Sequence, residues 1–171
     1  METLAAFVIG LFLWTFVEYV IHAWLSHTFE TFATPFHNSH HRDPHNVFAA
    51  RTWLPLAIIW SGAVVIWGFA TGVVFFSGIL AGFAAYEWLH YRIHFAEPCN
   101  ELESWLRTRH LIHHNHAAQR GFGVTTSVWD LVFGTDLNPA TDWVHADEAA
   151  RTPVLTGPTN LHKILRFNLQ P

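Results

Sequence analysis

The chain has 171 residues, enough for one domain and hardly for two. Hydrophobic residues make up 51% of it and charged residues 13%, whereas an average soluble domain has roughly 25% charged residues. This balance favours a lipid-facing exterior. The formal net charge of −4 gives no electrostatic case for nucleic-acid binding, and the single cysteine, Cys99, excludes an internal disulfide framework.

The first apolar segment, residues 3–25, is long enough to cross a bilayer, because 23 residues reach roughly 35 Å as a helix. No Lys or Arg precedes it and no small-residue cleavage pattern follows it, so we expect a retained membrane helix rather than a signal peptide. Glu18 and His22 interrupt its second half. Ionisable groups at that depth are costly unless they face the protein interior, so both residues predict a functional site.

The second apolar stretch, residues 53–86, contains no Asp, Glu, Lys, Arg or His. Its 34 residues would run about 51 Å as one helix, which is too long for a single crossing. We therefore expect two passes, with the chain reversing near Thr71-Gly72 or Ser77-Gly78.

The basic residues predict how these spans are oriented. All nine Lys and Arg residues follow either the first span or the third. By the positive-inside rule the N-terminus is outside, and residues 27–52 and 95–171 are cytoplasmic. The sequence thus predicts an all-α integral membrane protein with about three transmembrane helices and a cytoplasmic helical cap. Residues 1–137 form the membrane-embedded domain, and residues 138–171 a cytoplasmic tail to which no role is assigned.

Ten of the fourteen histidines fall in four clusters on this same side. The clusters are His22 and His27; His37, His40 and His41; His90 and His94; and His110, His113 and His114. Residues three and four apart share one face of a helix, so three of the clusters can each project their imidazoles together. His22 and His27 are five apart, about 140° around a regular helix, so the helix must end or loosen between them, near Ser26.

Ten imidazoles at one membrane face would supply two adjacent metal ions with nitrogen ligands. Neutral imidazole suits Fe, Zn, Cu or Ni, so the ligand type alone does not choose the metal. Two carboxylates lie near these histidines: Glu18 is four residues before His22, and Glu87 is three before His90. Each is a candidate to accept the second ring N–H of its histidine or to bridge the metals, and the alternative for each is a helix-packing hydrogen bond.

The remaining four histidines are expected to be polar surface residues. They are His45, His116, His145 and His162.

The pattern resembles the fatty acid hydroxylase and sterol desaturase superfamily from about Glu18 to Thr135. The resemblance rests on EYxxH at 18–22, HNSHH at 37–41 with Pro44 shortly after, EWLHYRIH at 87–94, RHLIHH at 109–114 and GFGVTTSVWDLVFGT at 121–135. It is strongest to the fatty acid 2-hydroxylase branch. The family often has four spans in two hairpins, whereas three are counted here, which leaves an oligomer open.

This resemblance implies a membrane-bound, non-haem di-iron oxygenase that hydroxylates an acyl lipid or fatty acid with O2 and electrons from an outside donor. Zinc is the alternative metal in a purified or inactive form. The chain leaves no room for a fused cytochrome b5 domain, so a separate donor of cytochrome b5 or ferredoxin type is expected. The small size suggests a bacterial inner-membrane protein. The implied metal ligands are His22, His27, His37, His40, His41, His90, His94, His110, His113 and His114.

Three other interpretations remain open. Within enzymes, a sterol desaturase or a carotenoid ring hydroxylase has similar histidine boxes. Outside enzymes, intramembrane His and Glu also mark metal transport or storage, but a transport path should place ligands along the membrane depth, and residues 53–86 carry none. A bis-histidine haem protein needs only two axial ligands per haem and does not explain two HxxHH boxes.

Overall fold

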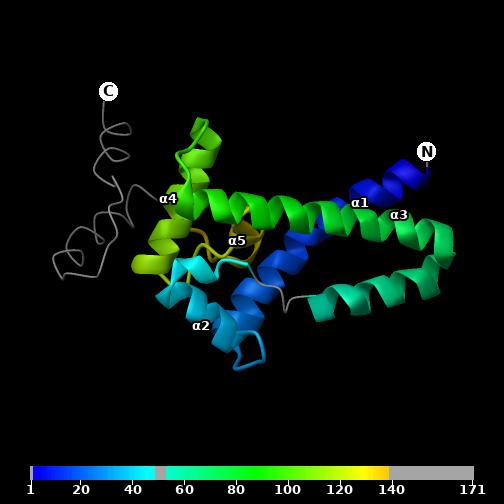
Figure 1. The fold of residues 1–171 in the computed structure, drawn as a ribbon, viewed down its shortest axis with the longest axis horizontal. Coiled ribbons are helices and arrows are strands. Elements are labelled where there is room, and N and C mark those ends of the chain that lie inside the picture. Colours follow the sequence, from blue (N-terminus) through cyan, green and yellow to red (C-terminus); the bar gives the residue numbers. More distant parts are fainter. Residues whose placement is uncertain (1, 49–52, 139–171) are drawn as a thin grey trace.

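The computed structural model describes residues 2–48 and 53–138, and every regular element in those ranges is helical (Figure 1). This confirms the all-α prediction for the described residues. Asn138 is the only described residue of the proposed tail, so His145 and His162 lie outside the described residues. In chain order the elements are α1 (Glu2–Tyr19), η1 (Val20–Thr28), α2 (Thr34–Arg42), η2 (Pro44–Asn46), α3 (Trp53–Phe95), α4 (Glu101–Asn115) and α5 (Val128–Phe133).

The first helix continues from α1 into η1, which is a π-helix rather than a helix end. A π-turn bonds residue i to residue i+5, and Phe29 N–H accordingly donates to Trp24 O at 2.8 Å. Ser26 Oγ also donates to the carbonyl of Ile21, five residues earlier. The loosening expected between His22 and His27 is therefore present, but the helix does not end at Ser26. The wider turn brings residues five apart onto one side of the helix.

The helix α3 is a hairpin whose reversal lies at Gly68, where φ is +75° and ψ is 164°. A left-handed φ favours glycine because it has no Cβ. Aromatic pairs join the two arms, with ring centroids 4.7 Å apart for Trp60 and Phe76. Two helical arms are present where the sequence predicts two passes, but the reversal lies at Gly68 rather than near Thr71-Gly72 or Ser77-Gly78.

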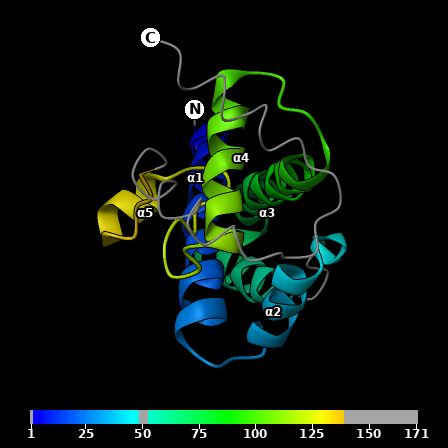
Figure 2. The same cartoon turned by 90° about the vertical axis from the view of Figure 1, so that its left-hand side faces the viewer.

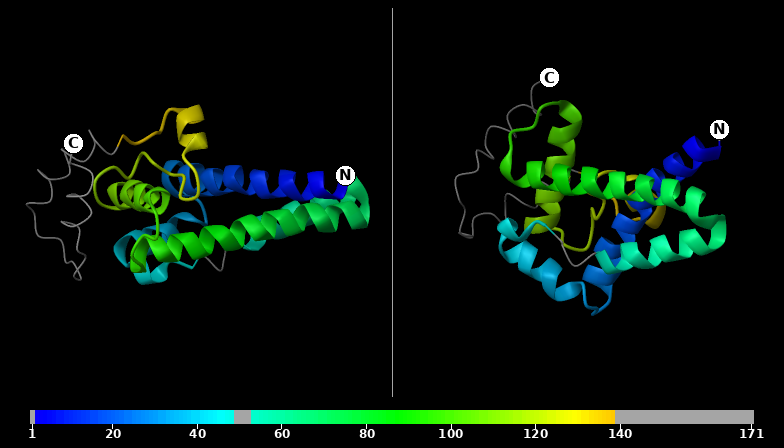
Figure 3. Two further views of the ribbon diagram at one scale, coloured as in Figure 1. Left: turned by 90° about the horizontal axis from the view of Figure 1, so that it is seen from above. Right: turned by 45° about the vertical axis from the view of Figure 1, so that its right-hand side comes forward.

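The glycines at those two predicted points serve close packing instead. A Cβ on Gly72 would lie 2.9 Å from Val64 Cα in the opposite arm of the hairpin. A Cβ on Gly78 would clash with the backbone of Phe7 in α1. Both glycines therefore let backbones approach one another, and α1 lies along α3 over much of its length (Figure 3).

Two helical stretches are long and apolar enough to cross a membrane, Glu2–Thr28 and Ala57–Phe95, each with a mean hydropathy of 2.1. The second contains most of the α3 hairpin. Only 22% and 28% of their most apolar windows are buried inside the protein, which argues against core helices of a soluble fold. Large side chains such as Val65 and Phe69 are 84% and 73% exposed. The N-terminus and the hairpin tip lie at the same end of the molecule (Figures 1 and 3).

The opposite end carries the cap, formed by α2, η2, α4, α5 and the loop 116–127 that joins α4 to α5. Viewed from that end, α4 crosses the middle, with α2 and α5 on either side of it (Figure 2). Two contacts fix α4 at its start. Asn100 Oδ1 caps the helix by accepting from Glu103 N at 2.8 Å, and Arg92 of α3 binds Glu103 through Nε at 2.5 Å and Nη2 at 3.0 Å.

Candidate metal centre

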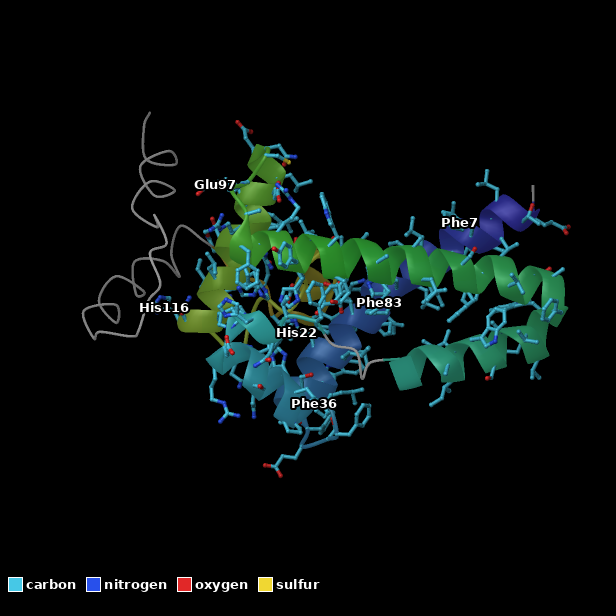
Figure 4. The ribbon with its side chains drawn as sticks, viewed as in Figure 1. Phe7, His22, Phe36, Phe83, Glu97 and His116 are labelled. Atoms are coloured by element: carbon cyan, nitrogen blue, oxygen red, sulfur yellow. The ribbon has the colours of Figure 1, made fainter. Side chains whose placement is uncertain are left out.

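The ten predicted histidines come together in two groups of five. Within each group the candidate ligand nitrogens all lie within 4.8 Å of one another. The first group, called cluster A, is His22, His27, His37, His41 and His113. The second, called cluster B, is His40, His90, His94, His110 and His114. In Figure 4, His22 marks the place where the first helix meets the cap.

Each HxxHH box is divided between the two clusters. On α2, His37 and His41 belong to cluster A and His40 to cluster B. On α4, His110 and His114 belong to cluster B and His113 to cluster A. Residues four apart stack on one line of a helix, while a residue one position away points about 100° elsewhere. Two helices therefore bridge both clusters, and this holds the two clusters side by side.

The separations between ring nitrogens fit ligands of a shared ion. Two ligands about 2.1 Å from one ion and at right angles to each other are about 3.0 Å apart. The Nε2 atoms of His90 and His94 each lie 3.0 Å from His110 Nε2 in cluster B. In cluster A, His113 Nε2 lies 3.0 Å from His22 Nε2 and 3.2 Å from His27 Nε2. Both clusters thus have the donor set and the spacing that a transition-metal ion requires.

Backbone carbonyls fix the tautomers of two rings in cluster A. His22 Nδ1 lies 2.5 Å from the Phe122 carbonyl oxygen, and His113 Nδ1 lies 2.9 Å from the Arg120 carbonyl oxygen. A carbonyl only accepts, so in each neutral ring the hydrogen is on Nδ1 and Nε2 presents a lone pair. Two lone pairs then face each other across the 3.0 Å between these Nε2 atoms. A cation between them removes that repulsion.

The environment keeps the cap histidines neutral, as metal ligation requires. Burial lowers the pKa of His40 from 6.5 to about 3, with further lowering from the imidazoles of His94 and His41. Burial likewise holds the pKa of His110 and His113 well below 6.5. The lone pairs are therefore available at neutral pH without competition from protons.

Glu18 does not take the place expected for it. Its Oε1 accepts from Val124 N at 2.6 Å and from Thr125 N at 3.0 Å, and its Oε2 accepts from Thr125 Oγ1 at 2.5 Å. The second ring nitrogen of His22 faces the Phe122 carbonyl instead. The spacing of four residues correctly predicted a shared side of the helix. It did not reveal that a loop more than a hundred residues later would occupy the carboxylate.

Glu87 and the two described histidines outside the clusters belong to neither five-histidine group. Glu87 lies in the wall of an apolar pocket together with Phe83 and Trp88, and it is not among the residues of either cluster. His45 is exposed and its Nδ1 lies 3.0 Å from Asp43 Oδ1. His116 follows the end of α4 at the surface.

Two buried charged residues that the sequence analysis did not single out support cluster A. Asp130 of α5 is fully buried and accepts from Phe122 N and Gly123 N, each at 2.9 Å. Arg109 of α4 is 1% exposed and lies 3.3 Å from Asp130 and 2.6 Å from Asp136. The sequence signal for Asp130 is its place inside the apolar run VWDLVF. A carboxylate that is buried there needs hydrogen-bond donors or a cation close to it.

A cavity of about 270 Å³ reaches both clusters. Two of its wall residues, His22 and His37, belong to cluster A, and two, His40 and His90, belong to cluster B. The rest of the wall is largely apolar and aromatic, with Trp14, Ile21, Phe32, Phe36, Val47, Phe48 and Tyr86 among its residues. An apolar molecule in this cavity would lie next to both candidate ion sites.

Fold and site together define a class of protein: a helical chain with a long, exposed apolar half and two five-histidine sites, each able to hold a metal ion, at one end. Residues 7–135 match the Fatty acid hydroxylase family, and the chain belongs to that family.

Similar proteins fit this assignment. The chain is 34% identical to the dihydroceramide fatty acyl 2-hydroxylase FAH1 of Arabidopsis thaliana over 78% of its length, and 34% identical to the ceramide very long chain fatty acid hydroxylase scs7 of Schizosaccharomyces pombe over 76%. It is 32% identical to the fatty acid 2-hydroxylase of Mus musculus over 75% of its length. It covers 61%, 42% and 38% of these three relatives, respectively.

The fold also matches a solved structure, described as full length scs7p with only the hydroxylase domain visible. The TM-score is 0.73 at 30% sequence identity, and the match covers 80% of this chain and 57% of that chain.

Proposed function

We propose that this protein is a membrane-bound lipid hydroxylase that inserts one oxygen atom of O2 into a C–H bond of an acyl chain. The observation that carries the proposal is the apolar cavity whose wall includes histidines of both clusters. The acyl 2-hydroxylase names of its relatives support this substrate class. The second oxygen atom leaves as water with two protons taken from the solvent, and the two electrons required come from a separate donor of cytochrome b5 or ferredoxin type.

The ten histidines would hold two ions, iron in the active enzyme, and these ions supply the activation of O2 when bound. The protein's own residues bind, orient and shield. The helices α2 and α4 contribute a ligand set to each cluster, so they fix the separation of the two sites. The aromatic wall of the cavity, including Trp14, Phe36 and Tyr86, would hold the chain by apolar contact and exclude water from the reacting carbon.

The membrane arrangement supports the same proposal. The helix Glu2–Thr28 and the two arms of α3 would form three spans, with the cap and both clusters at the cytoplasmic face of a bacterial inner membrane. A lipid substrate then already lies beside the entrance to the cavity. The exposed apolar residues of α1 and α3 face the acyl chains of the bilayer in this arrangement.

The test is expression in a lipid-producing host that also supplies an electron donor, followed by mass analysis of the extracted lipids. We expect a lipid that gains one oxygen atom, absent with His113→Ala, which removes a cluster A nitrogen. His45→Ala, a change at an exposed histidine, is the matched control and should retain the product. Loss of two hydrogens instead would indicate a desaturase. Bound metal without any lipid change, given a competent donor, would favour metal storage or transport.

A further inference from the structure

We propose that the two metal sites are unequal, and that Asp130 and Glu18 are positioning residues that make cluster A the tighter site. This inference rests on one part of the proposed function, namely that each cluster holds a metal ion. Neither carboxylate is a metal ligand in the arrangement observed. Both act through the loop 120–125, which runs between α4 and α5 and passes beside cluster A.

The loop 120–125 contacts two histidine rings of cluster A through its backbone carbonyls. The carbonyl of Arg120 accepts from His113 Nδ1, and the carbonyl of Phe122 accepts from His22 Nδ1. Such partners fix the ring orientation and the tautomer of a ligating histidine and increase its basicity. Two of the five rings in cluster A are therefore held before any ion binds.

The loop itself is held by hydrogen bonds to Asp130 and Glu18. Four consecutive amides donate to the two carboxylates: Phe122 and Gly123 to Asp130, and Val124 and Thr125 to Glu18. With the amides of residues 122–125 bound to carboxylates, the carbonyl of Phe122 remains directed at His22. Both carboxylates are almost completely buried, Asp130 at 0% exposed and Glu18 at 3%.

The loop is further tied to two separate helices. Glu18 is part of α1, next to the first histidine of cluster A, and Asp130 is part of α5. Arg109 of α4, one residue before a cluster B histidine, lies 3.3 Å from Asp130 and donates to the carbonyl of Leu137 at 2.7 Å. The two carboxylates therefore fasten the loop relative to the helices that carry the ligands, rather than only to itself.

Cluster B differs from cluster A in the hydrogen bonds that its ring nitrogens make in the described part of the chain. Among residues 2–48 and 53–138, the Nδ1 atoms of His40, His90 and His110 have no hydrogen-bond partner. His114 Nε2 has none in the same ranges. These rings pack against one another, as in the pair His110 and His114, whose centroids are 4.5 Å apart. Three rings of cluster B thus lack the carbonyl contact at Nδ1 that fixes two rings of cluster A.

Loss of such outer partners typically lowers metal affinity about 10–100-fold. We therefore expect the wild-type protein to bind two ions with affinities that differ by at least about tenfold, cluster A being the tighter. In Asp130→Asn, the neutral amide still fills the space but binds the two loop amides less well, so the tight affinity should fall about 10–100-fold while the weak affinity stays constant.

The experiment uses the purified full chain in lipid nanodiscs, loaded with Zn2+ alone and titrated with a chromophoric chelator. Two release steps are expected for the wild type. His40→Ala should remove the weak step and His27→Ala the tight one, which assigns each step to a cluster. Asp130→Asn should shift only the tight step. The matched control is Asp136→Asn, because Asp136 also binds Arg109 but accepts from none of the four loop amides.

A second variant covers the case in which Asp130→Asn does not fold. Thr125→Val removes the single hydroxyl that donates to Glu18 and should move the tight step in the same direction by a smaller factor. Release of both ions in one step by the wild type would overturn the proposal, as would an equal shift of both steps in either variant.

The metal-release experiment and the lipid analysis distinguish failure of this inference from failure of the proposed function. Equal release with an oxygenated lipid product overturns this inference alone, whereas unequal release without any lipid product overturns the proposed function alone. A chain that binds no ion overturns both.

Discussion

The apolar half of the molecule and the cap are stabilised in different ways. In the apolar half, α1 packs on α3 through glycines that allow backbone contact and through aromatic pairs such as Trp14 and Phe83, whose centroids are 5.1 Å apart. Where the cap meets η1 and the end of α3, the interior instead holds ten imidazoles together with buried charged groups such as Asp130 and Arg109. Removing atoms from the first leaves voids, whereas removing a partner in the second leaves buried polar groups without compensation. The two halves should therefore lose their structure under different conditions.

Low pH should produce the largest difference in stability between the cap and the apolar half of the metal-free protein. Histidines such as His40, whose pKa is about 3 in the fold and 6.5 unfolded, bind protons below pH 6.5 only when the chain unfolds. Stability is therefore present above pH 6.5 and lost as pH falls towards the folded pKa, by up to about 1.4 kcal/mol per pH unit for each such histidine. Hydrogen exchange should show the cap opening between pH 7 and about 5 while the apolar part of α3, before His90 and His94, stays protected.

Bound metal supplies the control for that measurement. An ion competes with protons for the same nitrogens, so the loaded cap should remain protected to a lower pH than the metal-free cap. Equal protection of the metal-free cap at pH 7 and pH 5, after correction for intrinsic exchange, would contradict the expectation.

Breaking the buried ion pair should have the next largest effect. Arg109→Met leaves Asp130, which is fully buried, without its cationic partner, and the expected loss of stability is about 3–5 kcal/mol. Unfolding by denaturant in nanodiscs measures it, with Arg42→Met, at an exposed arginine, as the control. A loss no larger than that of the control would show that the loop amides alone compensate Asp130.

A glycine substitution should disturb the apolar half to a smaller extent. In Gly78→Ala the new Cβ meets the backbone of Phe7, which forces α1 and α3 apart and costs about 1–3 kcal/mol. Gly62→Ala is the matched control in the same hairpin, because no heavy atom lies within 4 Å of its added Cβ. Thermal unfolding should separate the two variants, and equal midpoints would contradict the close packing described.

The smallest effect is expected at His45, whose side chain is 83% exposed and pairs with Asp43. His45→Ala should leave the number of bound metal ions per chain unchanged, as elemental analysis can measure. A missing ion in this variant would show that the ligand set extends beyond the ten clustered histidines.

Sequence reasoning recovered the histidines more fully than it recovered the geometry around them. The ten clustered positions could be predicted because helical spacing and a shared membrane face are visible in one dimension. The spacing within HNSHH and HLIHH permits a division of each box, but which cluster each histidine joins depends on how α2 and α4 are placed in the fold. Likewise, the reversal at Gly68 could not be told from one at Gly72, since a turn and a close helix contact both select glycine.

Glu18 and Asp130 also show that sequence spacing does not predict contacts between distant parts of the chain. Glu18 was noticed because it is near His22 along one helix, but its carboxylate accepts from Val124 and Thr125 while the second ring nitrogen of His22 faces the Phe122 carbonyl. Asp130 went unnoticed because it is distant in sequence from every histidine. Both act on a loop that comes close to cluster A only when α1, α4 and α5 are packed together.

The π-helix η1 makes the centre sensitive to chain length in a way that no side-chain substitution can reproduce. A π-turn is equivalent to one residue inserted into an α-helix. Deleting a single residue between His22 and His27 would let the segment relax to ordinary α-helical winding while keeping both ligands in the sequence. The two imidazoles would then be four apart on a regular helix and would still share one face, so the residues after them would keep nearly the same rotation relative to α1. A residue deleted from α1 itself would instead rotate everything after it by about 100°, so η1 could no longer present His22 and His27 to cluster A.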